Sequence, residues 1–317
     1  MNRVFVTQQL PEELVAPLQE SFEVRVWDGA VPVPDGVLAS EIAEVDGLLC
    51  FITNDIGVRL LAGAPNLRVI SQMAVGVDNI DVAECAKRGI LIGHTPGVLT
   101  ETVADSAFAL LAASVRRLPE GEKAVRAGEW GPWEPFHLTG ADLHGSTLGI
   151  VGMGRIGNAI ARRAVGFDMA VLYSAPTPKG PSDAEHVSLE TLLSKADHVI
   201  LAAALNMETR GLIGARELRL MKPTAYLVNV ARGPLVKTSD LVEALASGWI
   251  AGAALDVTDP EPLPPDHPLL SLPNCLVVPH MASASILTRT LMAKMAVDNL
   301  LAGLAGYPMP AEYQAPR

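Results

Sequence analysis

The sequence contains few cysteines and few basic residues, the two features that would most readily indicate a metal or a nucleic acid. Its three cysteines, Cys50, Cys85 and Cys275, are odd in number and match no metal-binding spacing, so we expect reduced thiols and no metal. Lys and Arg number 24 against 35 Asp and Glu, which gives a formal net charge of -11. Nucleic acids and anionic membranes attract clustered basic residues, so this balance argues against both as partners.

Long apolar runs are also missing. The most apolar stretch, ADSAFALLAASV, contains Asp105 and is too short to cross a bilayer. The segment MNRVFVTQQL runs directly into a strand-like sequence and has neither the basic leader nor the apolar stretch of a secretion signal. We therefore expect a cytoplasmic protein with no membrane partner.

The composition is that of a globular protein, with 49% hydrophobic and 19% charged residues, and 317 residues suffice for two domains. In the first hundred residues, strand-like segments alternate with helical ones such as PEELVAPLQE and DVAECAKRG. The strand-like segments are RVFVT, EVRVW, DGLLCFI, NLRVISQMA and ILIGHT. This alternation predicts a parallel sheet covered by helices.

A glycine-rich turn stands near the middle of the chain, in LGIVGMGRIGNAIARR. Gly152 permits a tight turn, Gly154 lets backbone amides approach a pyrophosphate, and Gly157 lets the following helix pack on its strand. The positive end of that helix would face the phosphates. A strand before the glycines and a helical period after them indicate a dinucleotide-binding fingerprint.

The flanking segments suggest how two domains are arranged. The sequence TETVADSAFALLAASVRRL predicts a long helix from about Thr100, and the segment GEWGPWEPFHLTGADLHG is too long to be a mere connection. After the fingerprint, strand and helix patterns alternate again, ending in the helical ILTRTLMAKMAVDNLLAGLA. We predict an α/β fold of two doubly wound parallel sheets with a cleft between them. A flavodoxin-like substrate domain would span residues 1–99 and 285–317, and a Rossmann dinucleotide-binding domain residues 100–284.

Three chemically versatile residues follow strand-like segments after the fingerprint: Arg232, Glu261 and His280. Ligands of open α/β sheets bind outside the carboxyl ends of strands, so these side chains could reach one crevice. Arg232 offers paired donors to a carboxylate, and His280 beside a Glu261 carboxylate could act as a proton donor. Taken singly, Arg232 could be a structural contact, Glu261 a solvated loop charge and His280 a core histidine.

Six segments together resemble the D-isomer-specific 2-hydroxyacid dehydrogenase family over nearly the whole chain. They are AVGVDNID, HTPGVLTETVAD, GMGRIG, VNVARGPLV, ALDVTDPEPLP and PHMASAS. The resemblance implies that Arg232, Glu261 and His280 are catalytic. It also implies that the backbone amides of Val75, Gly76 and Val77 bind the substrate carboxylate, although this segment could be a plain turn.

The same resemblance implies further cofactor contacts. Arg155 and Ile156 would lie on the pyrophosphate, Val230 and Ala231 on the nicotinamide side, and Asp256 would accept a hydrogen bond from the carboxamide. Asp256 could instead be an N-cap or a loop carboxylate. Asp78 and Asp81 are interpreted as structural, with Asp81 capping the helix that follows.

The segment GEWGPWEPFHLTG is similar to that of the glyoxylate and hydroxypyruvate reductase branch. This resemblance implies a homodimer with a tryptophan-bearing arm, in which Trp133, or alternatively Trp130, reaches the neighbouring subunit's substrate site. Both tryptophans could instead serve only interface packing. The chain also departs from its relatives, with His94 where Asn is usual, Asp105 where many carry Glu, and Ala282 where Gly is usual.

The expected cofactor is NADPH, with NADH possible. An NAD site usually has an acidic residue about twenty positions beyond the fingerprint, where it binds the ribose 2′-hydroxyl. Here Ala175 occupies that position, so no carboxylate would repel a 2′-phosphate. Ser174, Thr177 and Lys179 could contact that phosphate.

These observations predict an NAD(P)H-dependent reductase of small 2-oxo acids, by preference glyoxylate or hydroxypyruvate, which yields D-2-hydroxy acids. Two alternatives remain. One is a dehydrogenase of another small anion, such as phosphite or D-3-phosphoglycerate. The other is a non-catalytic, dinucleotide-sensing protein that resembles a corepressor.

Overall fold

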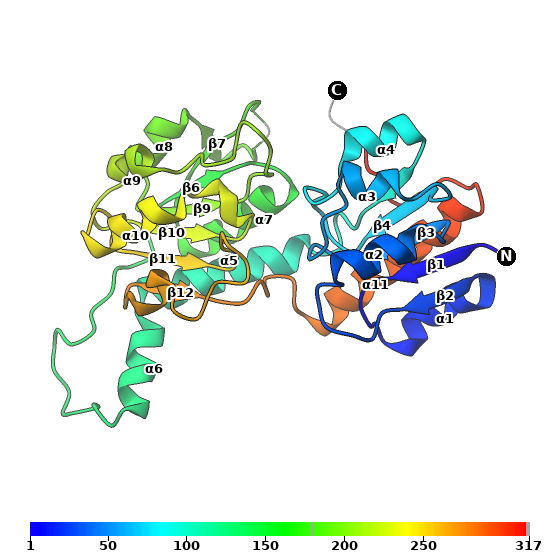
Figure 1. Ribbon diagram of the computed structural model, residues 1–317. Helices are drawn as coiled ribbons and strands as arrows, with labels where there is room; N and C mark the ends of the chain where they lie inside the picture. Colours follow the sequence, from blue (N-terminus) through cyan, green and yellow to red (C-terminus); the bar gives the residue numbers. More distant parts are fainter. Residues whose placement is uncertain (179, 315–317) are drawn as a thin grey trace. The chain divides into compact units, whose positions relative to one another are not determined.

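The computed structural model describes residues 1–178 and 180–314, which fold as two compact units. Unit 1 consists of Met1–Leu99 and Ser285–Arg317, and unit 2 of Thr100–Ala284. Each unit has its own parallel sheet with helices on its faces (Figure 1). The predicted α/β fold with two parallel sheets is confirmed.

The sheet of unit 1 has five parallel strands in the order β2-β1-β3-β4-β5. This order is that of flavodoxin-like domains, in which the switch point lies between the first and third strands. Every strand matches a segment predicted from sequence. The strands are β1 (Arg3–Val6), β2 (Glu23–Val26), β3 (Gly47–Cys50), β4 (Val69–Gln72) and β5 (Leu91–Gly93).

Helices cover both faces of this sheet. On one face, Phe5, Leu48 and Ile70 form a buried cluster with α2, α3 and α4. On the other, α11 packs against β3, β4 and α1. The helices are α1 (Glu12–Ser21), α2 (Asp35–Ile42), α3 (Val58–Ala62), α4 (Val82–Arg88) and α11 (Ile286–Leu304).

Two features of these helices bear on the sequence interpretation. Asp81 caps α4 as predicted, because its carboxylate accepts a hydrogen bond from the backbone N–H of Glu84 at 2.8 Å. The short helices α2 and α3 were not anticipated. At eight and five residues, each is too short for a helical period to be recognised in the sequence.

The sheet of unit 2 has seven parallel strands in the order β12-β11-β10-β9-β6-β7-β8. Counted from β6, this is the dinucleotide-binding order 3-2-1-4-5-6 with one further strand, and the switch point lies between β6 and β9. The strands are β6 (Thr147–Val151), β7 (Ala170–Ser174), β8 (Ala184–His186), β9 (His198–Leu201), β10 (Tyr226–Asn229), β11 (Gly252–Leu255) and β12 (Cys275–Val277). The edge strand β8 was missed because its AEH sequence has no apolar residue besides alanine.

One face of this sheet packs on α8, α9 and α10 around a large buried apolar cluster. The other face is covered by α5 and α7. The helices of unit 2 are α5 (Thr100–Val115), α6 (Leu118–Arg126), α7 (Arg155–Ala164), α8 (Leu189–Lys195), α9 (Ala215–Leu220) and α10 (Thr238–Ala246). The described residues of this unit also form 3₁₀ turns at η1 (Val165–Phe167), η2 (Gly233–Leu235) and η3 (Pro268–Ser271).

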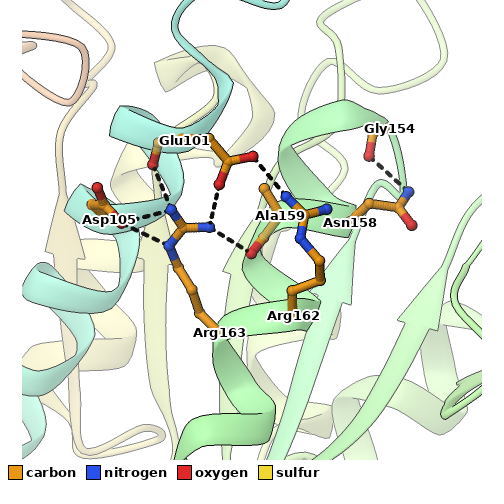
Figure 2. Close-up of polar contacts among 7 residues, drawn as sticks. All are labelled: Glu101, Asp105, Gly154, Asn158, Ala159, Arg162 and Arg163. Carbon is orange, nitrogen blue, oxygen red and sulfur yellow. Dashed lines mark hydrogen bonds and ion pairs between the residues drawn. The ribbon is translucent and has the colours of Figure 1, made fainter.

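An ion-pair network joins α5 to α7 (Figure 2). Arg163 donates hydrogen bonds to the Asp105 carboxylate at 2.7 Å and to the backbone carbonyl of Glu101 at 3.1 Å, and it pairs with the Glu101 carboxylate at 2.8 Å. Arg162 pairs with the same Glu101 at 2.6 Å. The Phe108 and Phe167 rings stack with centroids 5.4 Å apart. These contacts fix the helix that follows the glycine loop against its neighbour.

The structure corrects the predicted end of the long helix. Helix α5 stops at Val115, before the basic residues, because Arg117 takes a left-handed backbone conformation with φ of 53°. A separate helix, α6, then begins at Leu118 and buries none of its side chains within the described chain. The segment that follows α6 carries three strongly exposed aromatic side chains, Trp130, Trp133 and Phe136.

Among residues 1–178 and 180–314, every helix is too short or too polar to cross a membrane.

Candidate active site

The glycine loop joins β6 to α7 at the switch point of unit 2. Gly152 has a φ of +96°, and a Cβ there would lie 2.6 Å from the backbone of Ala203. At Gly157 a Cβ would lie 2.2 Å from the carbonyl oxygen of Gly152. Both positions therefore require glycine for the fold itself.

Gly154 differs, because a Cβ there would meet nothing within 4 Å. It is the N-cap of α7, and Arg155 and Ile156 form the first turn of that helix. Amides in the first turn of a helix have no partner within the helix and carry its positive dipole end. The open space beside Gly154 fits the pyrophosphate of a dinucleotide, and Arg155, which is exposed, could pair with it.

The next strand, β7, ends where the second half of a dinucleotide site would lie. Ser174 is its last residue and Ala175 follows, both half-buried, while Thr177 is exposed. Lys179 lies outside the described residues. One neighbour was not anticipated: the His186 ring, on β8, lies 2.9 Å from the carbonyl oxygen of Ala175 through Nε2. No carboxylate occurs between Ser174 and Pro178.

Arg232 follows β10 in a turn held by Asn229. The Asn229 amide group donates to the carbonyl of Arg232 at 2.8 Å, and its oxygen accepts from the N–H of Ala231 at 3.1 Å. Gly233 lies so close to the next loop that a Cβ would stand 1.9 Å from the carbonyl oxygen of Thr258. Val230 is buried and Ala231 half-buried in this turn. The rigid turn fixes the start of the Arg232 side chain.

His280 and Glu261 form a close pair. Nδ1 of His280 lies 2.5 Å from Oε1 of Glu261, and the other carboxylate oxygen accepts from the N–H of Thr258 at 3.3 Å. Burial raises the pKa of Glu261, but the hydrogen bond and charge of His280 and the charge of Arg232 outweigh it and hold the pKa below its usual range. The structure therefore brings all three predicted catalytic side chains into one electrostatic environment.

The loop that carries His280 is fixed by Asp256. His280 has a left-handed φ of 49°, unusual for a residue with a side chain. The Asp256 carboxylate is 2% exposed and accepts from the N–H groups of Met281 at 2.7 Å and Ala282 at 3.1 Å. The carbonyl oxygen of Ala282 in turn accepts a hydrogen bond from the Ser106 hydroxyl at 2.8 Å. Burial raises the pKa of Asp256.

The predicted carboxylate-binding segment belongs to unit 1, where Val75, Gly76 and Val77 follow the carboxyl end of β4. Val77 is buried, and the other two are half-buried. The N–H groups of these three residues have no hydrogen-bond partner within the part of the chain that the structure describes. Such unpaired amides could bind an anion.

Both tryptophans are strongly exposed. Trp133 is 85% exposed and Trp130 is 78% exposed, in the segment after α6. Within the described residues, no three His, Cys, Asp or Glu side chains form a group that could hold a metal. Cys50 and Cys85 are buried and Cys275 half-buried, and burial raises the pKa of Cys85 to about 11 and that of Cys275 to about 12.

Several supporting residues were not found from the sequence. Asn229 carried a usable signal, because Asn commonly bonds to the backbone two or three residues ahead in turns. Ser106 and His186 gave none, since each meets its partner from a distant element. Gln72 and His94, which contact the Val75–Val77 segment, were likewise not recognised as its supports.

The two glycines of the loop allow a matched test. Gly154→Ala should leave the melting temperature within about 1 °C of the wild type, because its Cβ meets open space, but abolish the stabilisation expected from an added nicotinamide dinucleotide such as NADPH, whose pyrophosphate would occupy that space. Gly152→Ala should lower the melting temperature of the protein even without dinucleotide, because of its φ and the contact with Ala203. Differential scanning calorimetry with and without NADPH measures both. If NADPH raised the melting temperature of Gly154→Ala as much as that of the wild type, the assignment of Gly154 to the pyrophosphate would be contradicted.

Comparison with known proteins places these features in a family. Residues 108–282 match the model of the D-isomer specific 2-hydroxyacid dehydrogenase, NAD binding domain. The chain is 48% identical over 305 residues to a glyoxylate reductase of Korarchaeum cryptofilum, covering 95% of this chain and 92% of that protein. It is 45% identical over 320 residues to the human glyoxylate reductase/hydroxypyruvate reductase, covering 98% of each.

Solved structures agree. The TT0316 protein from Thermus thermophilus superposes with a TM-score of 0.93 at 47% identity, covering 98% of this chain and all of that one. An NADPH-dependent glyoxylate/hydroxypyruvate reductase from Sinorhizobium meliloti, in complex with NADP and malonate, gives 0.86 at 34% identity, with coverage of 98% and 96%. These matches agree with the glycine loop and with the group formed by Arg232, Glu261 and His280. The chain belongs to the D-isomer specific 2-hydroxyacid dehydrogenase family, in its glyoxylate reductase branch.

Proposed function

We propose that this oxidoreductase reduces small 2-oxo acids, by preference glyoxylate and hydroxypyruvate, to D-2-hydroxy acids with a nicotinamide dinucleotide as hydride donor. The hydrogen-bonded pair of His280 and Glu261, with the charge of Arg232 acting on it, carries this proposal. The names and identities of the relatives favour this substrate class over phosphite, D-3-phosphoglycerate or a non-catalytic sensing role.

Arg232 would bind the substrate's polar end. Its planar guanidinium can donate paired hydrogen bonds to a carboxylate and polarise the adjacent carbonyl. The backbone amides of Val75, Gly76 and Val77 in unit 1 would bind a carboxylate. As electrons move onto the carbonyl oxygen, the guanidinium of Arg232 would stabilise the growing negative charge.

His280 would complete the reaction by donating a proton from its ring to that oxygen. When bound, the reduced nicotinamide supplies the hydride, so one 2-oxo acid, one hydride and one proton give one 2-hydroxy acid. Because Nδ1 of His280 is taken by Glu261, the proton must leave from Nε2. The Glu261 carboxylate, whose pKa is held below its usual range, would hold the ring through Nδ1 in the orientation that the donor requires.

The chain would orient the cofactor with several groups of unit 2. We assign Gly152, Gly154, Arg155, Ile156 and Gly157 to the pyrophosphate. Val230 and Ala231 would contact the nicotinamide ring. Oδ2 of Asp256 accepts one N–H, from Ala282, and therefore has a lone pair left. With that lone pair Asp256 would accept a hydrogen bond from the carboxamide while it still holds the His280 loop.

Replacing His280 tests the proton donor. Asn tolerates the left-handed backbone at this position, so His280→Asn should fold normally. It should lower kcat for glyoxylate reduction by about 10²-fold or more, as expected for loss of a general acid. The affinity for NADPH, measured by calorimetry, should not change. Wild-type kcat in this variant would remove His280 from the mechanism.

Glu261→Gln should remove an acidic limb from the pH profile. In the wild type the Glu261 carboxylate stays charged to a lower pH than an ordinary glutamate, because its pKa is lowered by the hydrogen bond and charge of His280 and by the charge of Arg232. We expect kcat/KM for reduction to fall only when Glu261 takes up a proton below that usual range, and we expect the neutral Gln to show no such fall on the acid side. A pH–rate profile that keeps the same acidic limb in the variant would show that Glu261 is not its source.

We further propose that NADPH is preferred over NADH. Ala175 leaves the end of β7 without a carboxylate, and Ser174, Thr177 and Lys179 could bind a 2′-phosphate. His186, hydrogen-bonded to the carbonyl of Ala175, adds a nitrogen-bearing ring at this edge. Ala175→Asp should therefore reverse the ratio of kcat/KM for NADPH to that for NADH, because the new carboxylate repels the phosphate and binds the 2′-hydroxyl. A wild-type ratio at or below one would contradict this preference.

We propose that the protein is a homodimer, assembled through α6 and the segment after it. This segment exposes Trp130, Trp133 and Phe136, while α6 buries no side chain of its own. Aromatic side chains exposed in this number are typical of interfaces. Trp133 would also reach the substrate site of the partner, with Trp130 as the alternative.

A further inference from the structure

The carbonyl oxygens of four successive residues, Ala74 to Val77, are all occupied from within unit 1. Two of the donors are backbone groups and two are side chains. The carbonyl of Ala74 accepts from Thr95 N–H at 2.8 Å, that of Val75 from Nδ1 of His94 at 2.9 Å, that of Gly76 from Nε2 of Gln72 at 2.9 Å, and that of Val77 from Ile80 N–H at 3.0 Å.

Because peptides are planar, these bonds also fix the directions of the neighbouring N–H groups. The peptide bonds of this segment are trans, since the cis bonds of the described chain all precede proline elsewhere. In a planar trans peptide, the carbonyl of one residue and the N–H of the next point in opposite directions. With the carbonyl of Val75 turned to His94, the N–H of Gly76 points away from His94. Likewise the N–H of Val77 points away from Gln72.

The amides so directed have no partner within the described chain, although this part of the protein is half-buried or buried. An unpaired backbone N–H in such a setting is destabilising unless a ligand or water accepts its hydrogen bond. Several such groups side by side make a local positive site without any charged side chain. A carboxylate is the natural acceptor.

We propose that His94 is a positioning residue for the substrate carboxylate, acting by holding the carbonyl of Val75 so that the Gly76 amide faces the ligand. The inference rests on the proposed reduction of 2-oxo acids. It adds a residue that acts through the carbonyl of Val75 and not by touching the substrate. Nδ1 of His94 must carry a proton to bond there, and the amide of an Asn side chain could donate to the same carbonyl.

His94 is itself held by several contacts, so its hydrogen bond can fix the direction of the Val75 carbonyl. Its backbone N–H donates to Ala311 at 3.0 Å, and its carbonyl accepts from the Asn299 side chain at 2.9 Å. Asn299 is fully buried in α11 and also accepts from the N–H of Ala311 at 2.8 Å. The His94 ring meets Tyr313 edge to face, with centroids 5.3 Å apart.

Gln72 holds the carbonyl of Gly76 in the same way, but it is less suited to mutation. It is fully buried, and its side chain also bonds to Asn79, which in turn donates to the carbonyls of Asn54 and Phe51. Replacing Gln72 would therefore leave several buried groups unpaired and threaten the fold. His94, half-buried at the edge of this network, gives the cleaner test.

The experiment uses the full-length protein loaded with NADPH and a carboxylate probe, oxalate, whose binding is measured by titration calorimetry. His94→Phe keeps a ring against Tyr313 but has no donor. It should weaken oxalate binding about fivefold to tenfold, as expected for loss of one hydrogen bond that orients an amide. His94→Asn should restore the affinity to within about twofold of the wild type. His144→Phe, at an exposed histidine of unit 2, is the matched control.

Kinetics give a second readout. His94→Phe should raise KM for glyoxylate by a similar factor while kcat and the affinity for NADPH stay within about twofold. If His94→Phe fails to fold, as judged by calorimetric melting, His94→Leu replaces it. Wild-type oxalate affinity in a folded variant without a donor would overturn the inference, and so would failure of His94→Asn to restore binding. Absence of glyoxylate turnover in the wild type would instead refute the proposed function.

Discussion

The parallel pairing of β6, β9, β10 and β11 is the constraint on which the positions of the proposed catalytic residues of unit 2 depend. Parallel strands place all their carboxyl ends at one edge of the sheet. The glycine loop leaves β6 at this edge, Arg232 leaves β10, and Asp256 leaves β11. Residues that are more than a hundred positions apart in the sequence therefore lie at the same edge of the sheet.

Much of this arrangement could be predicted from the residues, because strand patterns and the glycine loop are local signals. The strands of unit 1, the helix from Thr100 and the N-cap at Asp81 follow directly from such signals. Strand β8 and helix α6 could not be predicted in the same way. The former has almost no apolar residues, and the latter owes its start to the left-handed Arg117.

The supporting groups around the site show the limit of sequence reasoning more clearly. The resemblance pointed to Asp256, but not to the two backbone amides that its buried carboxylate holds. Ser106 and Ala282 are 176 positions apart, and their hydrogen bond depends on how α5 packs. His94 stood out as a departure from its relatives, although its contact with Val75 required the folded unit. Motifs identify the groups that react, whereas tertiary packing determines what holds them.

The segment after α6 gives the protein an optical property. Two of its four tryptophans, Trp130 and Trp133, lie there in contact with solvent, whereas Trp249 is covered by the guanidinium of Arg219 at 3.4 Å from the ring centroid. Indole emission depends on the polarity around the ring, so the emission of these two tryptophans should report whether this segment is in water or covered. The chain thus carries its own spectroscopic label at the surface that any partner covering this segment would desolvate.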